Sequence, residues 1–410
     1  MQFGLLLAFI SMYYGRWHSL LSGAHVMRGL LLLLLLLVLF SWGQKKLHPI
    51  INVLLVFLLL FLFLIPFARF TMGAYSTFIA MTKTVAISLI VFAVVDNWRK
   101  LASVVALLLV LHTYLAVTSL GGNSGGSEVV RLGAAGLAGG SWLGDPNDFA
   151  LAVNIVLPFA VCLLLNRRGV LRIPLLVCCA LLLAAIVVTY SRGGFLTLVA
   201  SMTCLWLLKG RKMGVAAVAA LLVGAVIVLA PQAYVERMKT ISTVDENDTS
   251  YGRLQLWKAG LYMLRDNPLT GVGPGSYYGS FGRDYIGLVD RHSGKWKVAH
   301  SAYITIAAEM GLPGILIYCY LLYLAIKENL ATRRLLLERG SPAWQVAICE
   351  GLICGLVAYA VGSAFLSVCY YLHLYFLAAL SASLAMMVRQ PAPERAREPG
   401  LAPRLAEAAK

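Results

Sequence analysis

Three short segments of the sequence hold the residue types that anion binding and acid–base chemistry require. The turn Ser191–Gly194 has an arginine followed by two glycines, a second arginine-bearing segment runs from Thr249 to Arg265, and His300 stands directly before Ser301. The guanidinium of arginine offers a planar fork to phosphate, and histidine can take a proton near neutral pH. The segments therefore predict an anion clamp and a general base.

The same residues also have plainer interpretations. Arg192 could extend to lipid headgroups without binding a substrate. The helix expected in the second segment could be an ordinary packed loop helix. His300 could hold a structural hydrogen bond, and Glu309, nine residues further on, would lie on roughly the opposite helix face from it.

The second segment predicts a helix over residues 249–265. Thr249 and Ser250 can cap its start, and Asn267-Pro268 stops it. Arg253 and Arg265 are twelve residues apart, so one face cannot present both to one small anion. An apolar face at helical spacing indicates an amphipathic helix lying against the membrane surface. That face is expected to consist of Leu254, Trp257, Leu261 and Leu264.

The glycine-rich stretch Gly271–Tyr277 predicts a shaped turn that re-enters the membrane face, and not a nucleotide site. It lacks the Gly-Lys-Ser/Thr ending and the preceding strand of a phosphate-binding loop, and Pro274 removes one N–H donor. Asp145 and Asp148 are spaced for one helix face, but no other ligand set accompanies them, so we expect no metal site.

Composition places these segments in a membrane protein. Hydrophobic residues make up 60% of the 410, charged residues only 13%, and the mean hydropathy is +0.81, whereas soluble domains are about 45–50% apolar and about 25% charged. Long apolar runs without strand-like alternation predict an all-α polytopic fold. The hydropathy predicts twelve spans, at roughly 3–14, 28–42, 48–66, 74–95, 101–119, 148–165, 173–190, 194–208, 213–230, 300–326, 345–366 and 367–388.

Basic residues fix the expected orientation. With the N-terminus in the cytoplasm, cytoplasmic loops and the tail carry nineteen Lys and Arg residues, against five in the short outer loops. This bias predicts that both termini are cytoplasmic, and it accounts for most of the net charge of +16 without any nucleic-acid partner. All eight cysteines fall within the predicted helices, so no disulfide framework is expected.

The predicted organisation has four parts. Residues 1–230 hold nine helices and an outer Gly/Ser-rich loop at 120–147; residues 231–299 form one large outer loop. Residues 300–388 hold the last three helices, and residues 389–410 form a Pro- and charge-rich tail that we expect to be disordered.

With these motifs and this topology, the chain resembles the O-antigen ligases, polytopic enzymes of the Gram-negative inner membrane. The family pattern is His-[Asn/Ser/Gln], nine residues, Gly, two residues, then Gly, Thr or Tyr. Here it is His300-Ser301, nine residues, Gly311, two residues and Gly314. The turn Ser191–Gly194 and the segment from Tyr251 to Trp257 also resemble the family's arginine-bearing segments.

The resemblance implies a GT-C-like glycosyltransferase with its active site facing the periplasm. It would move a glycan from an undecaprenyl-diphosphate carrier to lipid A–core in lipopolysaccharide biosynthesis, with inversion and with no metal, nucleotide or other cofactor. His300 would be the catalytic base, and the diphosphate would be held by arginines. The implied substrate-binding residues are Arg192, Arg253, Arg265, Tyr251, Trp257 and Ser301.

Three rival functions stay open. An O-antigen polymerase would extend the glycan, and a protein O-oligosaccharyltransferase would use Ser or Thr acceptors; both share motifs with the ligases. A lipid-linked oligosaccharide transporter is less favoured, because several predicted helices are almost wholly apolar and the polar groups gather on the outer side.

Overall fold

The structure is a computed structural model that describes residues 1–15, 24–42, 46–121, 144–166, 169–210, 224, 249–289 and 296–390. Within these residues every regular element is a helix, so the predicted all-α fold is confirmed. The main helices are α1 (Gln2–Gly15), α2 (Ala24–Ser41), α3 (Pro49–Leu64), α4 (Thr71–Val94), α5 (Trp98–Gly121), α6 (Pro146–Asn166), α7 (Arg172–Val188), α8 (Arg192–Leu208), α11 (Thr249–Asp266), α14 (Ala302–Glu338), α15 (Ala343–Gly362) and α16 (Leu372–Arg389).

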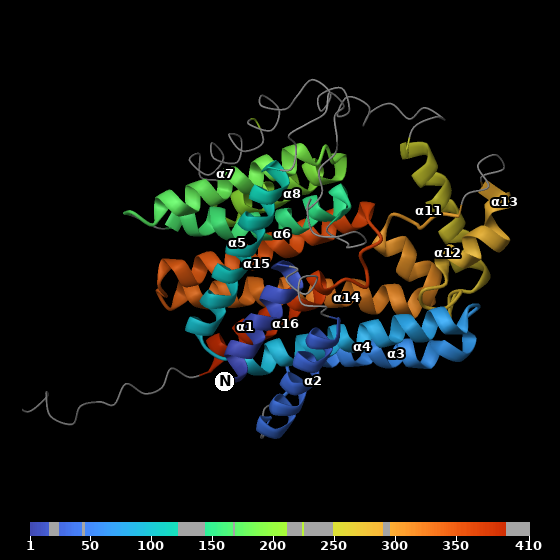
Figure 1. Ribbon diagram of the computed structural model, residues 1–410, viewed down its shortest axis with the longest axis horizontal. Coiled ribbons are helices and arrows are strands. Elements are labelled where there is room, and N and C mark those ends of the chain that lie inside the picture. The colour runs from blue at the N-terminus through green and yellow to red at the C-terminus, as the bar shows by residue number, and fades with distance from the viewer. Residues whose placement is uncertain are drawn as a thin grey trace, which may run out of the picture.

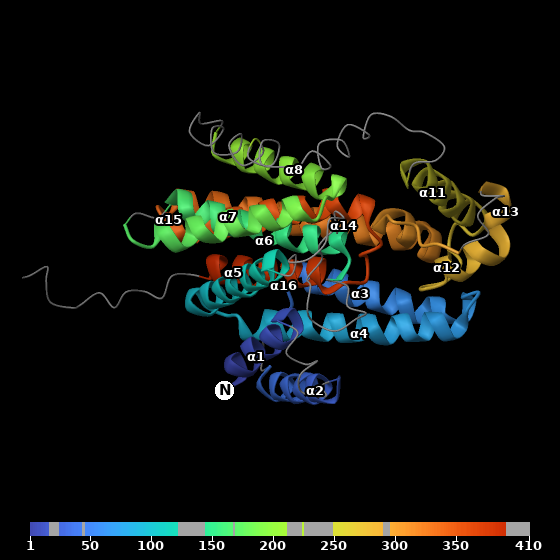
Figure 2. The same ribbon diagram turned by 45° about the horizontal axis from the view of Figure 1, so that its top comes forward.

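Most of these helices run side by side in one bundle, with α11 and the short helices beyond one end of it (Figures 1 and 2). Seven elements within the described residues are long and apolar enough to cross a membrane: α3 with its 3-10 extension Ile65–Phe67, α4, α5, α6, α14, α15 with its extension Ser363–Phe365, and α16. The apolar helices α1, α2, α7 and α8 are shorter. Eleven of the twelve expected spans thus have a helical counterpart, and 213–230 lies almost wholly outside the described residues.

The centre of the bundle is the pair α6 and α15. Small residues on α15 let the two backbones approach, as they do between membrane helices generally. A Cβ added to Gly351 would lie 2.6 Å from the ring of Phe159, and one added to Gly355 would lie 2.9 Å from the carbonyl oxygen of Ile155. The packing fixes α6, whose first residues reach the end of the bundle that faces α11.

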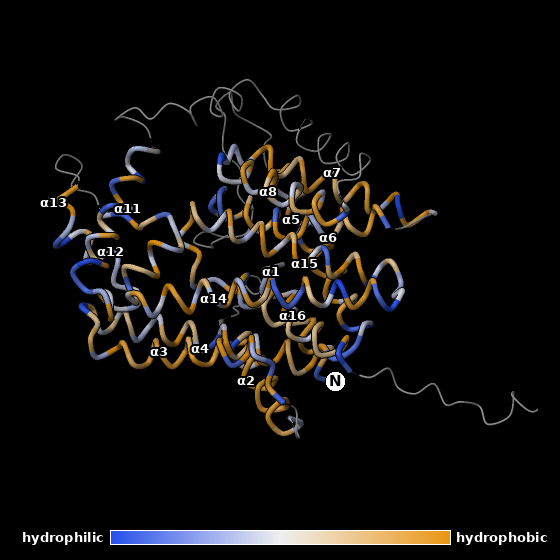
Figure 3. The backbone as a smooth tube through the Cα atoms, turned by 180° about the vertical axis from the view of Figure 1, so that it is seen from behind, coloured by the Kyte–Doolittle hydropathy of each residue, from blue (hydrophilic) through white to orange (hydrophobic). Residues whose placement is uncertain are grey.

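Charged side chains join the helix ends on the side of the bundle away from α11. Glu350 at the start of α15 is 1% exposed and pairs with Lys209 at 2.5 Å and with Arg333 at 3.0 Å. Glu328 accepts a hydrogen bond from Arg389 at 2.6 Å. Hydrophilic residues gather at this end and around α11, whereas hydrophobic residues dominate the length of the bundle (Figure 3). Several basic residues of the predicted cytoplasmic set therefore also hold helices together.

Helix α14 differs from the prediction in length and in shape. It extends to Glu338, twelve residues beyond the expected end, because its last turns leave the apolar region while still burying Asn329, Thr332 and Leu336. It is also broken at Gly311, whose backbone is non-helical at φ 66° and ψ −165°. The first nine residues, Ala302–Met310, therefore form a separately directed segment. Likewise α15 and α16 are separated by a connection, as expected, but α16 begins at Leu372 rather than 367.

Residues 249–289 and 296–300, called the loop unit below, form a small core together with Ala308 of α14. It includes Leu256, Ala259 and Met263 of α11, packed with Tyr277 and Phe281 of the following short helices α12 (Tyr277–Ser280) and η4 (Phe281–Tyr285, a π-helix), which lead into α13 (Ile286–Val289). On the predicted apolar face of α11, Leu254 and Leu261 are outside this core, at 49% and 52% exposed, so the contact of that face with a membrane surface stays a prediction. The glycine turn between α11 and α12 packs against α14.

Candidate active site

The turn before α8 is built around the Ser191 side chain. Ser191 caps the helix by accepting a hydrogen bond from the Gly194 N–H at 3.1 Å, and its hydroxyl donates to the Asn147 side-chain oxygen at 2.9 Å. Tyr190 takes a left-handed conformation, with φ of 50°, to make this turn. Asn154 of α6 donates to the Gly194 carbonyl at 3.1 Å. Polar contacts from Asn147 and Asn154 thus fix the start of α8 to α6 at two positions.

Close packing makes the second glycine of the turn necessary. A Cβ on Gly194 would lie 2.9 Å from the Cβ of Ala150, nearer than real side chains approach. Position 193 faces Phe365 at ordinary contact distance. The turn therefore brings the N-terminus of a 17-residue helix, which carries partial positive charge, to the bundle end that faces the loop unit.

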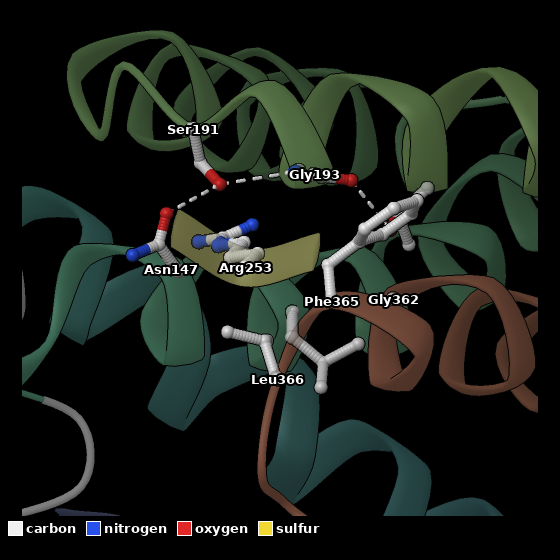
Figure 4. A pocket seen from close by; sticks show the side chains of 10 residues that line it. Asn147, Ser191, Gly193, Arg253, Gly362, Phe365 and Leu366 are labelled. Atoms are coloured by element: carbon white, nitrogen blue, oxygen red, sulfur yellow. Dashed lines mark hydrogen bonds between the residues drawn. The ribbon is translucent and has the colours of Figure 1, made fainter. Parts of the chain in front are cut away.

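A small pocket forms where α11 meets this turn (Figure 4). The Arg253 side chain from the loop unit enters it beside Asn147, Ser191 and Gly193, and Phe365 closes another side. The pocket is narrow, with a volume of about 10 Å³, which is space for about one water molecule. Two motifs 59 residues apart in sequence thus meet. Arg192, the first residue of α8, is half-buried and is not among the residues that line the pocket.

His300 lies within electrostatic reach of this pocket. Its pKa is lowered from 6.5, first by burial and then by the positive charges of Arg253 and Lys297, while Asp145 acts in the opposite direction. The side chain is half-buried, and its backbone takes a left-handed conformation with φ of 50°. A lowered pKa keeps the imidazole neutral, and therefore able to accept a proton, down to lower pH.

Two predicted substrate-binding residues hold His300 in place instead of facing the pocket. The Trp257 indole donates a hydrogen bond to the Ala299 carbonyl at 3.1 Å, just before His300. Ser301 is 3% exposed and caps α14 by accepting from the Ile304 N–H at 3.5 Å. Both side chains use polar atoms for the backbone around His300, so we assign them positioning roles.

The remaining predicted residues lie along α11. Tyr251 is in its first turns and is half-buried, but it is not among the residues that line the pocket. Arg265 is at the other end, about 18 Å from Arg253 along the helix axis. It is 68% exposed and pairs with Asp266 at 2.9 Å, which lowers the pKa of that carboxyl. The structure therefore brings Arg253, and not Arg265, to the turn before α8.

Asn147 and the residues between α15 and α16 were not predicted from the sequence. Asn147 bridges the start of α6 to Ser191, and Phe365 and Leu366 form a pocket wall. The signal for the first was present: Asp145-Pro146-Asn147 is a typical helix start, with a capping side chain before a proline. Asp145 indeed accepts hydrogen bonds from the Asn147 and Asp148 N–H groups at 2.7 and 3.3 Å.

Among the described residues, no group of three or more His, Cys, Asp or Glu side chains is close enough to hold a metal ion. The arrangement offers instead the Arg253 guanidinium and the N-terminus of α8 at the pocket, with Arg192 next to Ser191 in the chain and the His300 imidazole within electrostatic reach of Arg253. Such a set can stabilise an anion that develops during a reaction and accept a proton from a hydroxyl group.

The fold and the site are those of a multi-pass α-helical membrane protein with a pocket of mixed polar and apolar lining at one end of its bundle. A family model described as O-antigen ligase matches residues 177–319. This match confirms the resemblance to the O-antigen ligase family. The matched stretch runs from α7 past the break in α14 and so contains Arg192, Arg253 and His300. No curated protein matches the chain.

The family that residues 177–319 match has a general activity. Members of the O-antigen ligase and polymerase superfamily are glycosyltransferase-like enzymes that act on lipid-linked polysaccharides in membranes. Residues 177–319 of this chain are similar to that superfamily.

Proposed function

We propose that the chain is an O-antigen ligase. It transfers a glycan from an undecaprenyl-diphosphate carrier to a sugar of lipid A–core, at the periplasmic face of the bacterial inner membrane. The observation that supports this proposal most is the meeting of Arg253 with the Ser191–Gly194 turn, within electrostatic reach of His300.

In this proposal the arginines act on the leaving group. As the bond between the anomeric carbon and the diphosphate oxygen breaks, negative charge gathers on the lipid diphosphate. Arg192 and Arg253 stabilise that charge, helped by the N-terminus of α8. A preorganised donor of this kind is typically worth about 10²–10³ in rate. No metal enters the proposed reaction.

His300 acts on the other substrate. Its neutral imidazole takes the proton of the acceptor hydroxyl as the oxygen attacks the anomeric carbon from the face opposite the diphosphate. One bond forms and one breaks in a single displacement, so the configuration inverts. A positioned base contributes about 10²–10⁴ in rate.

The acceptor decides between ligase, polymerase and protein-directed transferase. The test reconstitutes the purified protein in liposomes with carrier-linked glycan and offers lipid A–core, a second carrier-linked glycan or a Ser/Thr-containing peptide. The proposal expects product on lipid A–core only. Elongation of the carrier-linked glycan would identify a polymerase, and a glycosylated peptide would identify a protein O-oligosaccharyltransferase. Passage of the donor across the membrane without a new glycosidic bond would identify a transporter.

A further inference from the structure

The break in α14 leaves backbone groups that the glycine turn of the loop unit satisfies. Carbonyl groups at the end of the segment Ala302–Met310 lose their helical partners at Gly311. The Val272 N–H donates to the Ala308 carbonyl and the Gly273 N–H to the Glu309 carbonyl, both at 2.9 Å, and the Leu312 N–H donates to the Pro268 carbonyl at 2.8 Å. The turn and the broken helix are therefore paired in both directions.

This pairing depends on the absence of side chains at two positions. Gly311 has φ of 66°, and a Cβ there would lie 2.6 Å from the Pro268 oxygen. Gly271 has φ of 62°, and a Cβ there would lie 2.3 Å from the Glu309 carbonyl carbon. The glycine of the family motif is thus explained as a close approach between the loop unit and α14.

The Glu309 carboxylate completes the connection. It is 3% exposed and accepts hydrogen bonds from the Gly275 N–H at 2.7 Å and the Tyr277 N–H at 2.8 Å. The Tyr370 hydroxyl, from the connection before α16, donates to the same carboxylate. A buried carboxylate is costly unless several donors compensate it, and these three donors come from two parts of the chain distant in sequence. The side chain faces the turn and not His300, as its spacing predicted.

The same segment of α14 is connected to the two site residues of the loop unit, His300 and Arg253. Its first residue follows His300-Ser301, and α11 packs against it so closely that a Cβ on Gly260 would lie 2.3 Å from the Ile304 side chain. Trp257 of α11 holds the backbone before His300. A rotation of Ala302–Met310 would therefore displace Arg253 and His300 together relative to the Ser191–Gly194 turn, which belongs to the bundle.

From this geometry we propose that Glu309 is a positioning residue, whose carboxylate locks the loop unit onto the bundle and so aligns His300 and Arg253 with the Ser191–Gly194 turn. This inference rests on the proposed function, in which His300 is the base. Glu309 touches no substrate. Its effect on the reaction passes through the backbone of the turn and of Ala302–Met310, and misplacement by about 1 Å can cost about 10²-fold in rate.

The test compares Glu309→Gln with Glu350→Gln in nanodiscs of phosphatidylethanolamine and phosphatidylglycerol. Glu350 is a matched control, because it is an equally buried carboxylate at the other end of the bundle. Glutamine keeps the size of the side chain but places an N–H₂ group against one of the two backbone donors. Tyr370→Phe, which removes one donor and keeps the ring, is the milder variant and carries the test if Glu309→Gln does not fold.

Hydrogen exchange measured on the turn tests the lock without reference to activity. We expect the amides of Gly275 and Tyr277 to exchange at least tenfold faster in Glu309→Gln than in wild type, and to be unchanged in Glu350→Gln. Equal exchange in wild type and Glu309→Gln would overturn the inference.

The pH profile of glycan transfer tests alignment. The pKa of His300 is lowered by burial, by Arg253 from α11 and by Lys297 three residues before it, and raised by Asp145 before α6. Release of the lock should move His300 and Arg253 together away from the Ser191–Gly194 turn and expose the imidazole to water. Since burial is the largest cause of the lowered pKa of His300, this pKa should rise toward 6.5. We expect the acid limb of kcat to move to higher pH and kcat to fall at least tenfold in Glu309→Gln, with no shift of the limb in Glu350→Gln.

The outcomes separate this inference from the proposed function. Faster exchange with an unmoved acid limb and unchanged kcat would make the lock merely structural and overturn the positioning role. Wild-type transfer by His300→Gln would refute the proposed base, and the positioning role with it, even where exchange shows that the lock exists.

Discussion

Replacement of Arg253 by lysine, compared with the same change at Arg265, tests whether the two arginines of α11 differ in function. Lysine keeps the positive charge but loses the planar fork, and so one of two charge-assisted hydrogen bonds to a diphosphate. A hydrogen bond to a charged group contributes about 1.5–3 kcal/mol, and 1.4 kcal/mol corresponds to a factor of ten, so we expect kcat/KM to fall about 10- to 100-fold. Arg265→Lys is the control on the same helix.

The structure predicts almost no effect for the control. Arg265 is 68% exposed, pairs with its neighbour Asp266, and lies about 18 Å from Arg253 along the axis. Its lysine variant should stay within twofold of wild type. The assay is the initial rate of glycan transfer in proteoliposomes, with the amount of folded protein measured for each variant. Wild-type rates in Arg253→Lys, or an equal loss in Arg265→Lys, would refute the reasoning.

The acid limb of the pH profile should move in opposite directions when two charges near His300 are removed. Asp145→Asn keeps the capping oxygen of α6 but removes a charge that raises the pKa of His300, so the acid limb should move to lower pH. Lys297→Gln removes a charge that lowers this pKa, so the limb should move to higher pH. A shift in the same direction for both variants would count against His300 as the titrating base. Gly311→Ala should destabilise the protein by about 2 kcal/mol or more in thermal unfolding, because Gly311 has a positive φ and a Cβ there would collide with Pro268. Gly340 has a φ of 60° but open space around it, so Gly340→Ala should cost only about 1 kcal/mol in the same measurement. Trp257→Phe keeps the ring but not the donor to Ala299, so kcat should fall several-fold with donor affinity unchanged, as a binding titration against the wild-type protein would check.

Most of the described apolar helices were predictable because hydropathy measures the transfer of side chains from water to lipid, and this transfer largely decides whether a helix enters a membrane. Helix α14 shows where this signal ends. Its last turns are polar on one side, so hydropathy placed its end at 326 rather than Glu338. The break at Gly311 depends on a partner 43 residues earlier in the chain, at Pro268, and no local pattern contains that partner.

The faces of α11 show a second limit. Two apolar stripes overlap on this helix, one with Leu254 and Leu261 and the other with Leu256 and Met263. Periodicity detects both but does not tell which one packs against protein; in the structure it is the second. Sequence patterns likewise identify the motif residues but not the groups with which their side chains form hydrogen bonds. Trp257 and Ser301 have polar side chains suited to a substrate, yet their hydrogen bonds go to the backbone around His300.

The most direct test of the proposed transfer site is a comparison of purified His300→Gln with wild type, offered carrier-linked glycan and lipid A–core. Glutamine preserves polarity but cannot act as the base at neutral pH. The proposed mechanism predicts a loss of transfer of at least about 10²-fold, with donor binding and folded yield retained. Full-rate synthesis of glycosylated lipid A–core by the folded variant would contradict it.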